Sequence, residues 1–256
     1  MDTRFWGPSG WRFLHSVTFS YELERKNAFR RFFEALPFVL PCKFCRTSLQ
    51  EYMEVDPVDP ALDSKESLCR WLWRIHNKVN SKLRSQGQPV DPDPPFEKVK
   101  AFYEDLLAAG CAKTEFPGWD FLFSIADLHP LSSIVRKSVP MAGYSDAVEC
   151  KTVAEKNKWN CMTPEERMVP YGKFWNSIQE VLPFKEWRAV WSKYADSKTK
   201  TKKKTISWLW SQRCAVEKEL NLINRCKFSS LCKTLRVHRS GCSKSKRART
   251  CRKKKN

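Results

Sequence analysis

Apolar side chains recur every three or four positions through the first hundred residues, which is the period of an amphipathic α-helix. Trp11, Leu14, His15 and Thr18 share one face of a first helix, whose first turn we place at Pro8. Four more helices are predicted. The second carries the apolar stripe Phe29, Phe32, Phe33, Leu36 and Leu40, is bent or broken at Pro37 and is ended by Pro41, and the third follows a cysteine pair and carries Leu49 and Tyr52. The fourth starts at Ser64 and carries Leu68, Leu72, Ile75, Val79 and Leu83, and the fifth covers residues 96–109 and is ended by Gly110. No alternating stretch accompanies them, so the predicted fold class is all-α, a four-helix bundle plus a short fifth helix.

The composition and periodicity of the sequence change after about residue 112. Residues 113–196 are rich in Trp and broken by loops, and we expect a mainly helical additional domain there. Residues 197–205 are typical of an exposed linker, residues 206–224 of one more helix, and the end of the chain is too charged to pack and is predicted to be disordered. The predicted domains are therefore 1–112, 113–196 and a basic, cysteine-containing helix and tail over 197–256.

Charge is concentrated in that last part. Residues 197–256 hold 20 Lys and Arg against two Glu, a net +18, while the whole chain of 256 residues carries +19. Such a tail attracts polyanions without reading their sequence, so nonspecific nucleic-acid contact is a possible role. No run of about 18 apolar residues occurs, and the first residues lack the apolar stretch of a secretory leader. We expect an intracellular chain that does not enter a membrane.

Two cysteines, Cys42 and Cys45, stand between Pro41 and a predicted helix. A helix N-terminus favours a thiolate, and Lys43 and Arg46 add positive charge, so the pair suits a dithiol/disulfide couple. Three alternatives stay open: two buried thiols, a zinc site completed by Cys69 and His76, and a thioredoxin-like motif. The helical surroundings disfavour the thioredoxin-like alternative, since that motif follows a strand.

A second ridge runs beside the apolar stripe of the fourth helix. It carries Cys69, Trp73, His76 and Asn80 at helical spacing, with Asn77 next to it. Buried imidazoles and amides need hydrogen-bond partners, which a flat heteroaromatic ligand could supply. Trp11 and His15, one turn apart on the first helix, could add a stacking face and a polar contact.

Three linked motifs, "WGPSGWRFLH", "LPCKFC" and "HNKVNSKL", give residues 5–108 a resemblance to the flavin-linked sulfhydryl oxidases of the Erv/ALR family, most similar to versions carried by large DNA viruses. The resemblance implies a thiol oxidase that binds FAD, forms disulfides in protein dithiol substrates and passes the electrons to molecular oxygen as hydrogen peroxide. It also implies a homodimer formed through the first two helices and, for a viral protein, the host cytoplasm and the virion as locations.

The resemblance assigns roles to particular residues. It makes Cys42 the sulfur that meets substrate and Cys45 the one beside the flavin, and it implies no metal site. The FAD contacts that it implies are Gly7, Trp11 and His15 on the first helix, Cys45, then His76, Asn77, Val79, Asn80 and Lys82 on the fourth, and Tyr103.

The chain departs from the family at Gln86. Cellular members have a structural disulfide from the position of Cys69 to this one, so Cys69 is left free or pairs elsewhere, for example with Cys111. Cys150 and Cys161 could form a disulfide or be two core thiols. The cysteines near the end of the chain could act as an electron shuttle or bind zinc with His238; they are Cys214, Cys226, Cys232, Cys242 and Cys251. The competing function is a nucleic-acid-binding or scaffold protein that retains an oxidase-like bundle.

Overall fold

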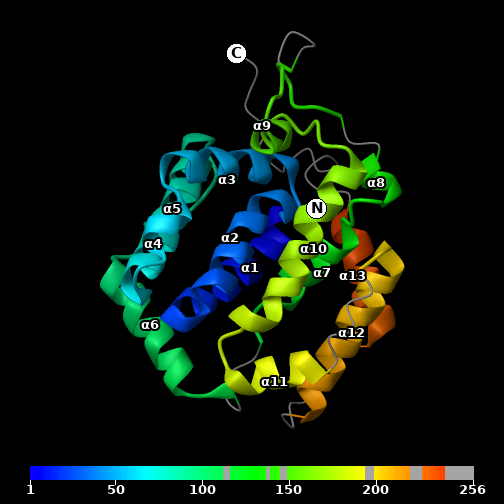
Figure 1. Ribbon diagram of the computed structural model, residues 1–256. Helices are drawn as coiled ribbons and strands as arrows, with labels where there is room; N and C mark the ends of the chain where they lie inside the picture. The colour runs from blue at the N-terminus through cyan, green and yellow to red at the C-terminus, as the bar shows by residue number, and fades with distance from the viewer. Residues whose placement is uncertain (112–115, 137–138, 145–148, 194–198, 220–226, 240–256) are drawn as a thin grey trace.

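The computed structural model describes residues 1–111, 116–136, 139–144, 149–193, 199–219 and 227–239. Within these residues every regular element is helical, which confirms the all-α prediction. In chain order they are α1 (Thr3–Phe19), a 3-10 turn (Leu23–Arg25), α2 (Lys26–Val39), α3 (Lys43–Val55), α4 (Val58–Ala61), α5 (Lys65–Ser85), α6 (Phe96–Ala108), α7 (Trp119–Asp127), α8 (Ser133–Arg136), α9 (Val153–Lys158), α10 (Pro164–Val181), α11 (Lys185–Lys193), α12 (Lys202–Glu219) and α13 (Phe228–Arg239) (Figure 1).

The first half forms the predicted bundle. Helices α1, α2, α3 and α5 pack together, and α6 lies against α1. The start of α1 differs from the prediction: the Asp2 carboxylate accepts from the Arg4 N–H at 3.0 Å, so the helix begins at Thr3 and Pro8 lies inside it. Ser64 caps α5 as predicted, and Gly110 follows α6 with φ of 77°.

Two segments expected to be loops contain helix. The Pro-rich stretch before Ser64 includes the short helix α4, whose Val58 and Ala61 are buried. The expected linker at 197–205 overlaps α12, which begins at Lys202; there the Thr205 side chain is fully buried and donates to the Thr201 carbonyl at 2.9 Å. Burial in the core makes these polar and Pro-rich stretches helical, and their local composition does not indicate it.

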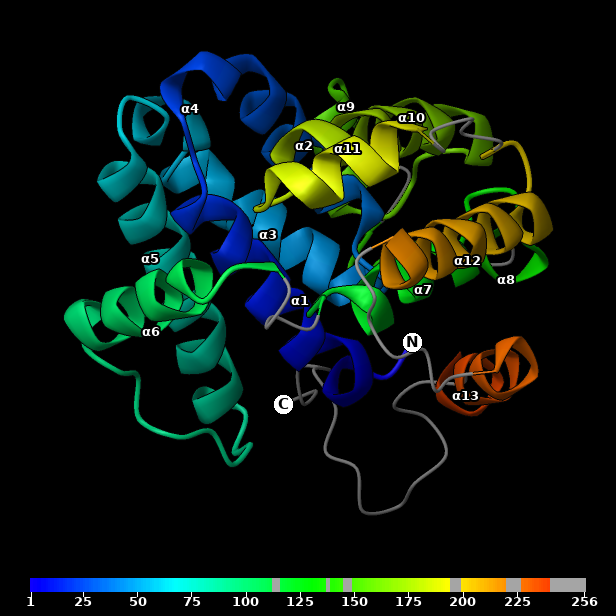
Figure 2. The same cartoon turned by 90° about the horizontal axis from the view of Figure 1, so that it is seen from below.

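The second half covers α1 and α2. Helix α10 runs along α2 and α7 packs on α1, as both views show (Figures 1 and 2). The rings of Phe32 and Phe174 stack with centroids 5.2 Å apart across the α2–α10 contact. At the α1–α7 contact, a Cβ on Gly10 would lie 3.1 Å from the Phe121 ring, so glycine permits the close approach. One hydrophobic cluster therefore extends through both halves, from Trp6 to Leu235.

A buried carboxylate fastens the last helices to the body. Asp127, at the end of α7, has no exposed surface and accepts from Arg239 at 2.6 and 2.7 Å and from Lys202 at 2.7 Å. On the same side of α13, the His238 ring stacks on Phe5 with centroids 4.3 Å apart. Helix α13 thus lies beside the N-terminus. The domain boundaries predicted after residues 112 and 196 lie outside the described residues and stay a prediction.

Candidate functional site

The cysteine pair occupies the N-terminus of α3, as the sequence predicts. Cys42 is the N-cap residue, and its sulfur accepts from the Cys45 N–H at 3.4 Å. A hydrogen bond with the Cys45 side chain, aided by this backbone bond and by the charge of Arg46, lowers the pKa of Cys42 to about 6, against the opposing effect of burial. Cys42 is therefore largely a thiolate at neutral pH, which is the form that attacks disulfides and other electrophiles.

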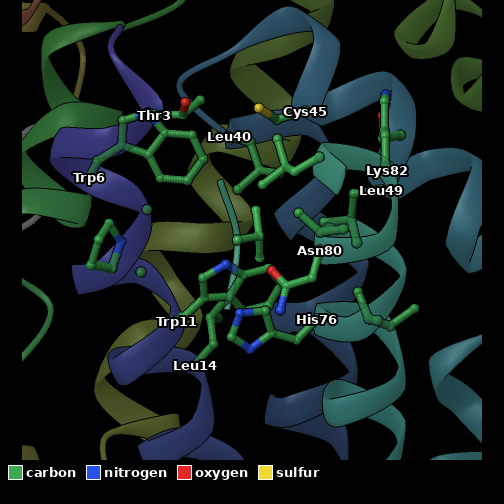
Figure 3. Close-up of a pocket in the computed structure, with 18 of the residues that line it drawn as sticks. Thr3, Trp6, Trp11, Leu14, Leu40, Cys45, Leu49, His76, Asn80 and Lys82 are labelled. Atoms are coloured by element: carbon green, nitrogen blue, oxygen red, sulfur yellow. The ribbon is translucent and has the colours of Figure 1, made fainter. Parts of the chain in front are cut away.

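A cavity of about 620 Å³ lies between α1 and α5, within the size range of about 300–1,000 Å³ usual for ligand pockets. Figure 3 shows the Cys45 sulfur at one end and the rings of Trp11 and His76 at the other, with Leu40 and Leu49 between them. The Trp11 and His76 rings are stacked, with centroids 3.9 Å apart and planes within 13°. The cavity therefore has flat aromatic rings at one end and a thiol at the other.

Most of the predicted site residues meet at this cavity. Those that line it are Gly7, Trp11, Cys45, His76, Val79, Asn80, Lys82 and Tyr103. Cys42, His15 and Asn77 are not in the lining. The structure therefore brings Cys45 together with residues of α1 and α5 at the cavity. His15 contacts the lining through His76, whose Nδ1 lies 3.2 Å from His15 Nε2.

Two histidines support one wall of the cavity. His15 Nε2 lies 3.2 Å from His76 Nδ1, and the His15 ring stacks on Tyr103 with centroids 5.1 Å apart. Burial, together with the nearby His76, lowers the pKa of His15 to about 3, and burial lowers the pKa of His76 to about 4. Both rings are therefore neutral at physiological pH, and one of the two facing nitrogens donates to the other.

Asn80 is held by a carboxylate in the loop after α5. Its Nδ2 donates to Asp93 at 2.7 Å, and Arg84 also binds Asp93. The Arg84 hydrogen bond is the main reason that the pKa of Asp93 lies below its usual value. Trp73 Nε1 donates to the Pro94 carbonyl at 3.0 Å. These bonds fasten the loop that carries Gln86, where the family resemblance leaves no disulfide.

Several lining residues were not predicted. Trp6, Thr3 and Arg4 line the cavity because α1 begins before Pro8, and Ser48 lines it from α3. Lys82 Nζ donates to the Ser48 hydroxyl, which joins α5 to α3. Asp2, a residue type that commonly caps helices, could have indicated the longer α1. Nothing in the sequence singles out Ser48.

The lining fits a flat, partly polar cofactor such as FAD. Trp6 Nε1, on a residue that lines the cavity, is buried and has no hydrogen-bond partner within the described part of the chain. A Cβ placed on Gly7 would meet no atom within 4 Å, so the backbone leaves open space there. Asn80 and Lys82 add polar groups, and the stacked rings add a face for a planar group. These residues would hold the isoalloxazine and adenine parts of FAD by stacking and hydrogen bonding.

The other cysteines show different surroundings. Burial raises the pKa of Cys69 to about 12, and its neighbours belong to a small cluster around Phe19, Phe96 and Tyr103, whereas Cys111 packs against the main core. Burial also raises the pKa of Cys161, whose side chain is hydrogen-bonded with Cys150. No set of three or more residues suited to a metal occurs among the described residues. Cys226, Cys242 and Cys251 lie outside them.

Among the described residues, no helix is both long and apolar enough to cross a membrane.

Comparison with known proteins supports the resemblance over the first hundred residues. Residues 8–100 match the Erv1 / Alr family. The chain is 34% identical over 87 residues to the mitochondrial FAD-linked sulfhydryl oxidase ERV1 of Saccharomyces cerevisiae, covering 32% of this chain and 45% of that protein. It is 36% identical over 85 residues to the probable FAD-linked sulfhydryl oxidase R368 of Acanthamoeba polyphaga mimivirus (31% and 59%), and 28% identical over 87 residues to the putative FAD-linked sulfhydryl oxidase 096R of Invertebrate iridescent virus 3 (32% and 59%).

These matches confirm that the first half of the chain is similar to the Erv/ALR oxidases, viral members included. The chain spans about half the length of the curated relatives that it matches. No solved structure matches it significantly.

The buried histidines predict how stability depends on pH. The pKa of His15 is about 3 in the folded chain and near 6.5 when unfolded, so the unfolded state takes up the proton first as pH falls. This contribution to the free energy of unfolding is complete above about pH 6.5 and should fall by up to about 1.4 kcal/mol per pH unit below it. Urea unfolding of wild type and His15→Gln at pH 7, 6 and 5 should show a shallower dependence in the variant. Parallel pH dependences would contradict this account.

Proposed function

We propose that this chain is an FAD-linked sulfhydryl oxidase that forms disulfide bonds in protein substrates. The observation that carries the proposal is the placement of the cysteine pair: Cys45 lines one end of a cavity suited to a flat cofactor, while Cys42, one turn earlier, lies outside that lining. A pair placed in this way can exchange disulfides with a substrate on one side and pass electrons inward on the other. The similarity of residues 8–100 to the Erv1 / Alr family supports the same reaction.

In the proposed reaction a substrate thiolate attacks the Cys42 sulfur of the oxidised pair. The Cys42–Cys45 bond breaks, a mixed disulfide forms, and Cys45 leaves as a thiolate. A second substrate thiol then displaces Cys42, so the substrate gains a disulfide and the pair holds two electrons. When bound, FAD would accept these electrons from Cys45 and pass them to O₂, giving hydrogen peroxide.

The chain's own residues prepare this exchange. The hydrogen bond with Cys45, aided by the charge of Arg46 and by the α3 N-terminus, keeps Cys42 ionised near neutral pH. Trp11 and His76 would stack on the cofactor, the Asp93 carboxylate orients the Asn80 amide, and the apolar walls around Leu40 and Leu49 exclude water from the Cys45 side. The alternative, a nucleic-acid-binding or scaffold protein, would not require an ionised Cys42 or a cavity next to Cys45.

The purified protein should be yellow and should consume O₂ in the presence of dithiothreitol. Cys42→Ser and Cys45→Ser should each lower that rate at least about a hundredfold while flavin stays bound, because either change removes the disulfide. Cys42→Ser leaves the Cys45 thiol at the cavity and should show a broad long-wavelength absorption band with bound flavin. Cys69→Ser is the matched control, because Cys69 belongs to the separate apolar cluster around Phe19 and Phe96 and does not line the cavity. Colourless protein that takes up no added FAD would contradict the proposal, and the band appearing in Cys45→Ser would reverse the two roles.

The family resemblance predicts a homodimer through the first two helices, and the packing of this chain favours a different assembly. Helices α7 and α10 of the same chain cover α1 and α2. The positions of α2 that stay exposed are polar, namely Asn27, Arg31 and Glu34, and Arg31 pairs with Glu180 of α10 at 2.8 Å. We propose that the second half occupies the face that a partner would use and that the chain is a monomer.

Sedimentation velocity tests this assembly. A single species close to 30.0 kDa should persist over a hundredfold range of protein concentration. A concentration-dependent species of twice that mass would support the homodimer instead.

We further propose that the basic end of the chain gives nonspecific contact with nucleic acid in an intracellular setting, in keeping with the viral sources of two relatives. Ending the chain after Arg239 keeps α12 and α13 and removes residues 240–256, which carry eight Lys and Arg and no acidic residue. Retention on immobilised DNA should weaken, and its salt dependence should become shallower. Oxidation of dithiothreitol should not change. Equal retention of both proteins on DNA would exclude this role, and fractionation of producing cells tests the setting.

A further inference from the structure

Two arginines meet beside the cysteine pair, one from each half of the chain: Arg46 is half-buried and Arg167 is buried. Arg46 follows Cys42 by one turn of α3, and its backbone N–H donates to the Cys42 carbonyl at 3.0 Å. Arg167, on α10, is 6% exposed. Asn160 joins the two, because its Oδ1 accepts from Arg46 Nη2 at 2.8 Å and from Arg167 Nη2 at 3.0 Å. One neutral amide oxygen therefore lies between two guanidinium groups.

Neither guanidinium has an ion pair with a carboxylate of the described residues. Glu166, the neighbour of Arg167, pairs instead with Lys156 at 2.5 Å. The remaining acceptors are neutral: the Leu40 carbonyl for Arg46, at 3.0 Å, and the Asn157 amide oxygen for Arg167, at 3.4 Å. Arg46 Nε is buried and has no hydrogen-bond partner in this part of the chain. Since buried charges are costly unless paired, two adjoining guanidinium groups need a negative charge nearby.

The cysteine pair can supply that charge, because the Leu40 carbonyl that accepts from Arg46 Nη1 at 3.0 Å also accepts from the Cys42 backbone N–H at 2.8 Å. Burial lowers the pKa of Arg46, and the negative charge of Cys42 and Cys45 opposes the shift. Burial and repulsion from Arg46 lower the pKa of Arg167 to about 9. The Cys45 thiol and the N-terminal amine also influence the pKa of Cys42, and Cys161 and Glu166 influence the pKa of Arg167. Lys43 donates instead to the Val139 carbonyl, 3.0 Å away.

The backbone fixes Asn160 in this position. Its φ is 58°, in the left-handed region that Asn, Asp and Gly adopt most readily. Its Nδ2 donates to the Val139 carbonyl at 2.8 Å, and its backbone N–H donates to the Asn157 carbonyl at 3.1 Å. The side-chain oxygen is therefore held toward the arginines by contacts that lie entirely in the second half.

We propose that Arg167, acting through Asn160, holds the Arg46 guanidinium beside Cys42, so that the second half of the chain sets the reactivity of the cysteine pair. Arg46 supplies the charge, and Arg167 and Asn160 are positioning residues. This role of the second half, control of Cys42 reactivity, rests on the proposed oxidase function. The ionisation of Cys42, which measures this control, can be followed without flavin or substrate.

Asn160→Asp is the sharpest test, because it keeps the shape, the acceptor oxygen and the backbone conformation while adding one negative charge. The carboxylate would neutralise the arginines and compete with the Cys42 thiolate. In the reduced full-length protein, the pH dependence of Cys42 alkylation by iodoacetamide, read by peptide mass spectrometry, should have its midpoint near pH 6 in wild type. The midpoint should rise by about one unit in Asn160→Asp, a rate about tenfold lower on the acidic side.

Arg167→Gln should shift the midpoint in the same direction, and Arg167→Lys, which keeps the charge, should recover part of the shift. Arg188→Gln is the matched control: Arg188 on α11 also binds carbonyl oxygens, those of Leu182 and Pro183, at the opposite end of the molecule from α3 (Figure 1). It should lower stability and leave the Cys42 midpoint unchanged.

An Asn160→Asp midpoint within about 0.3 unit of wild type would overturn the proposal. Failure of Asn160→Asp to fold would overturn it too, because a carboxylate between two uncompensated guanidinium groups should be well tolerated. If wild type binds no flavin yet the midpoints move as expected, the proposed oxidase function fails and this inference stands.

Discussion

The stacking of aromatic rings between α2 and α10 is the interaction on which the rest of the structure depends. Phe32 packs against Phe13 and Phe33 of the bundle and against Phe174 of the second half, and none of these four side chains has exposed surface. Burying a ring of this size contributes about 1.5–3 kcal/mol, so a seam of several rings resists separation of the halves. With α10 fixed along α2, the segment before it, residues 149–163, is carried over the N-terminus of α3, where Asn157 also donates to the Pro37 carbonyl at 3.1 Å.

The cavity and the cysteine pair have opposite electrostatic requirements, and the structure meets them on two sides of one helical turn. On the cavity side, His15 and His76 are kept neutral by burial, so the wall presents rings without charge. On the outer side, the hydrogen bond with Cys45, aided by Arg46 and the α3 N-terminus, favours a negative sulfur at Cys42. Because the helix dipole acts within its first turn, a separation of three residues is enough for Cys42 and Cys45 to experience different fields.

Much of the first half could be predicted from the sequence, and the reasons differ from element to element. Helical periodicity located α2, α3, α5 and α6, since each buries one apolar stripe, and the spacing of Trp11, His76 and Asn80 placed three of the cavity residues on facing helices. Local patterns could not show that α7 and α10 would cover α1 and α2. Apolar residues such as Phe174 and Trp175 would be buried equally in a separate domain and in a core shared with the first half. Nor could they identify Arg167, because an arginine in a helix is usually exposed. Its contact with Asn160 joins α10 to the irregular segment before it, whose path depends on tertiary packing.

The left-handed backbone at Asn160 restricts which residues this position can accept over evolution. Glycine would keep the conformation and lose the amide, aspartate would keep the shape and reverse the charge balance, and most other side chains would be strained by about 1 kcal/mol or more. Chains whose second half docks in this way should therefore share a short sequence pattern. The pattern is Cys-x-x-Cys-Arg at the start of a helix, followed further along the chain by an asparagine seven positions before an arginine. Such a signature could separate them from relatives that are similar only in the first half, even where overall identity in the second half has been lost.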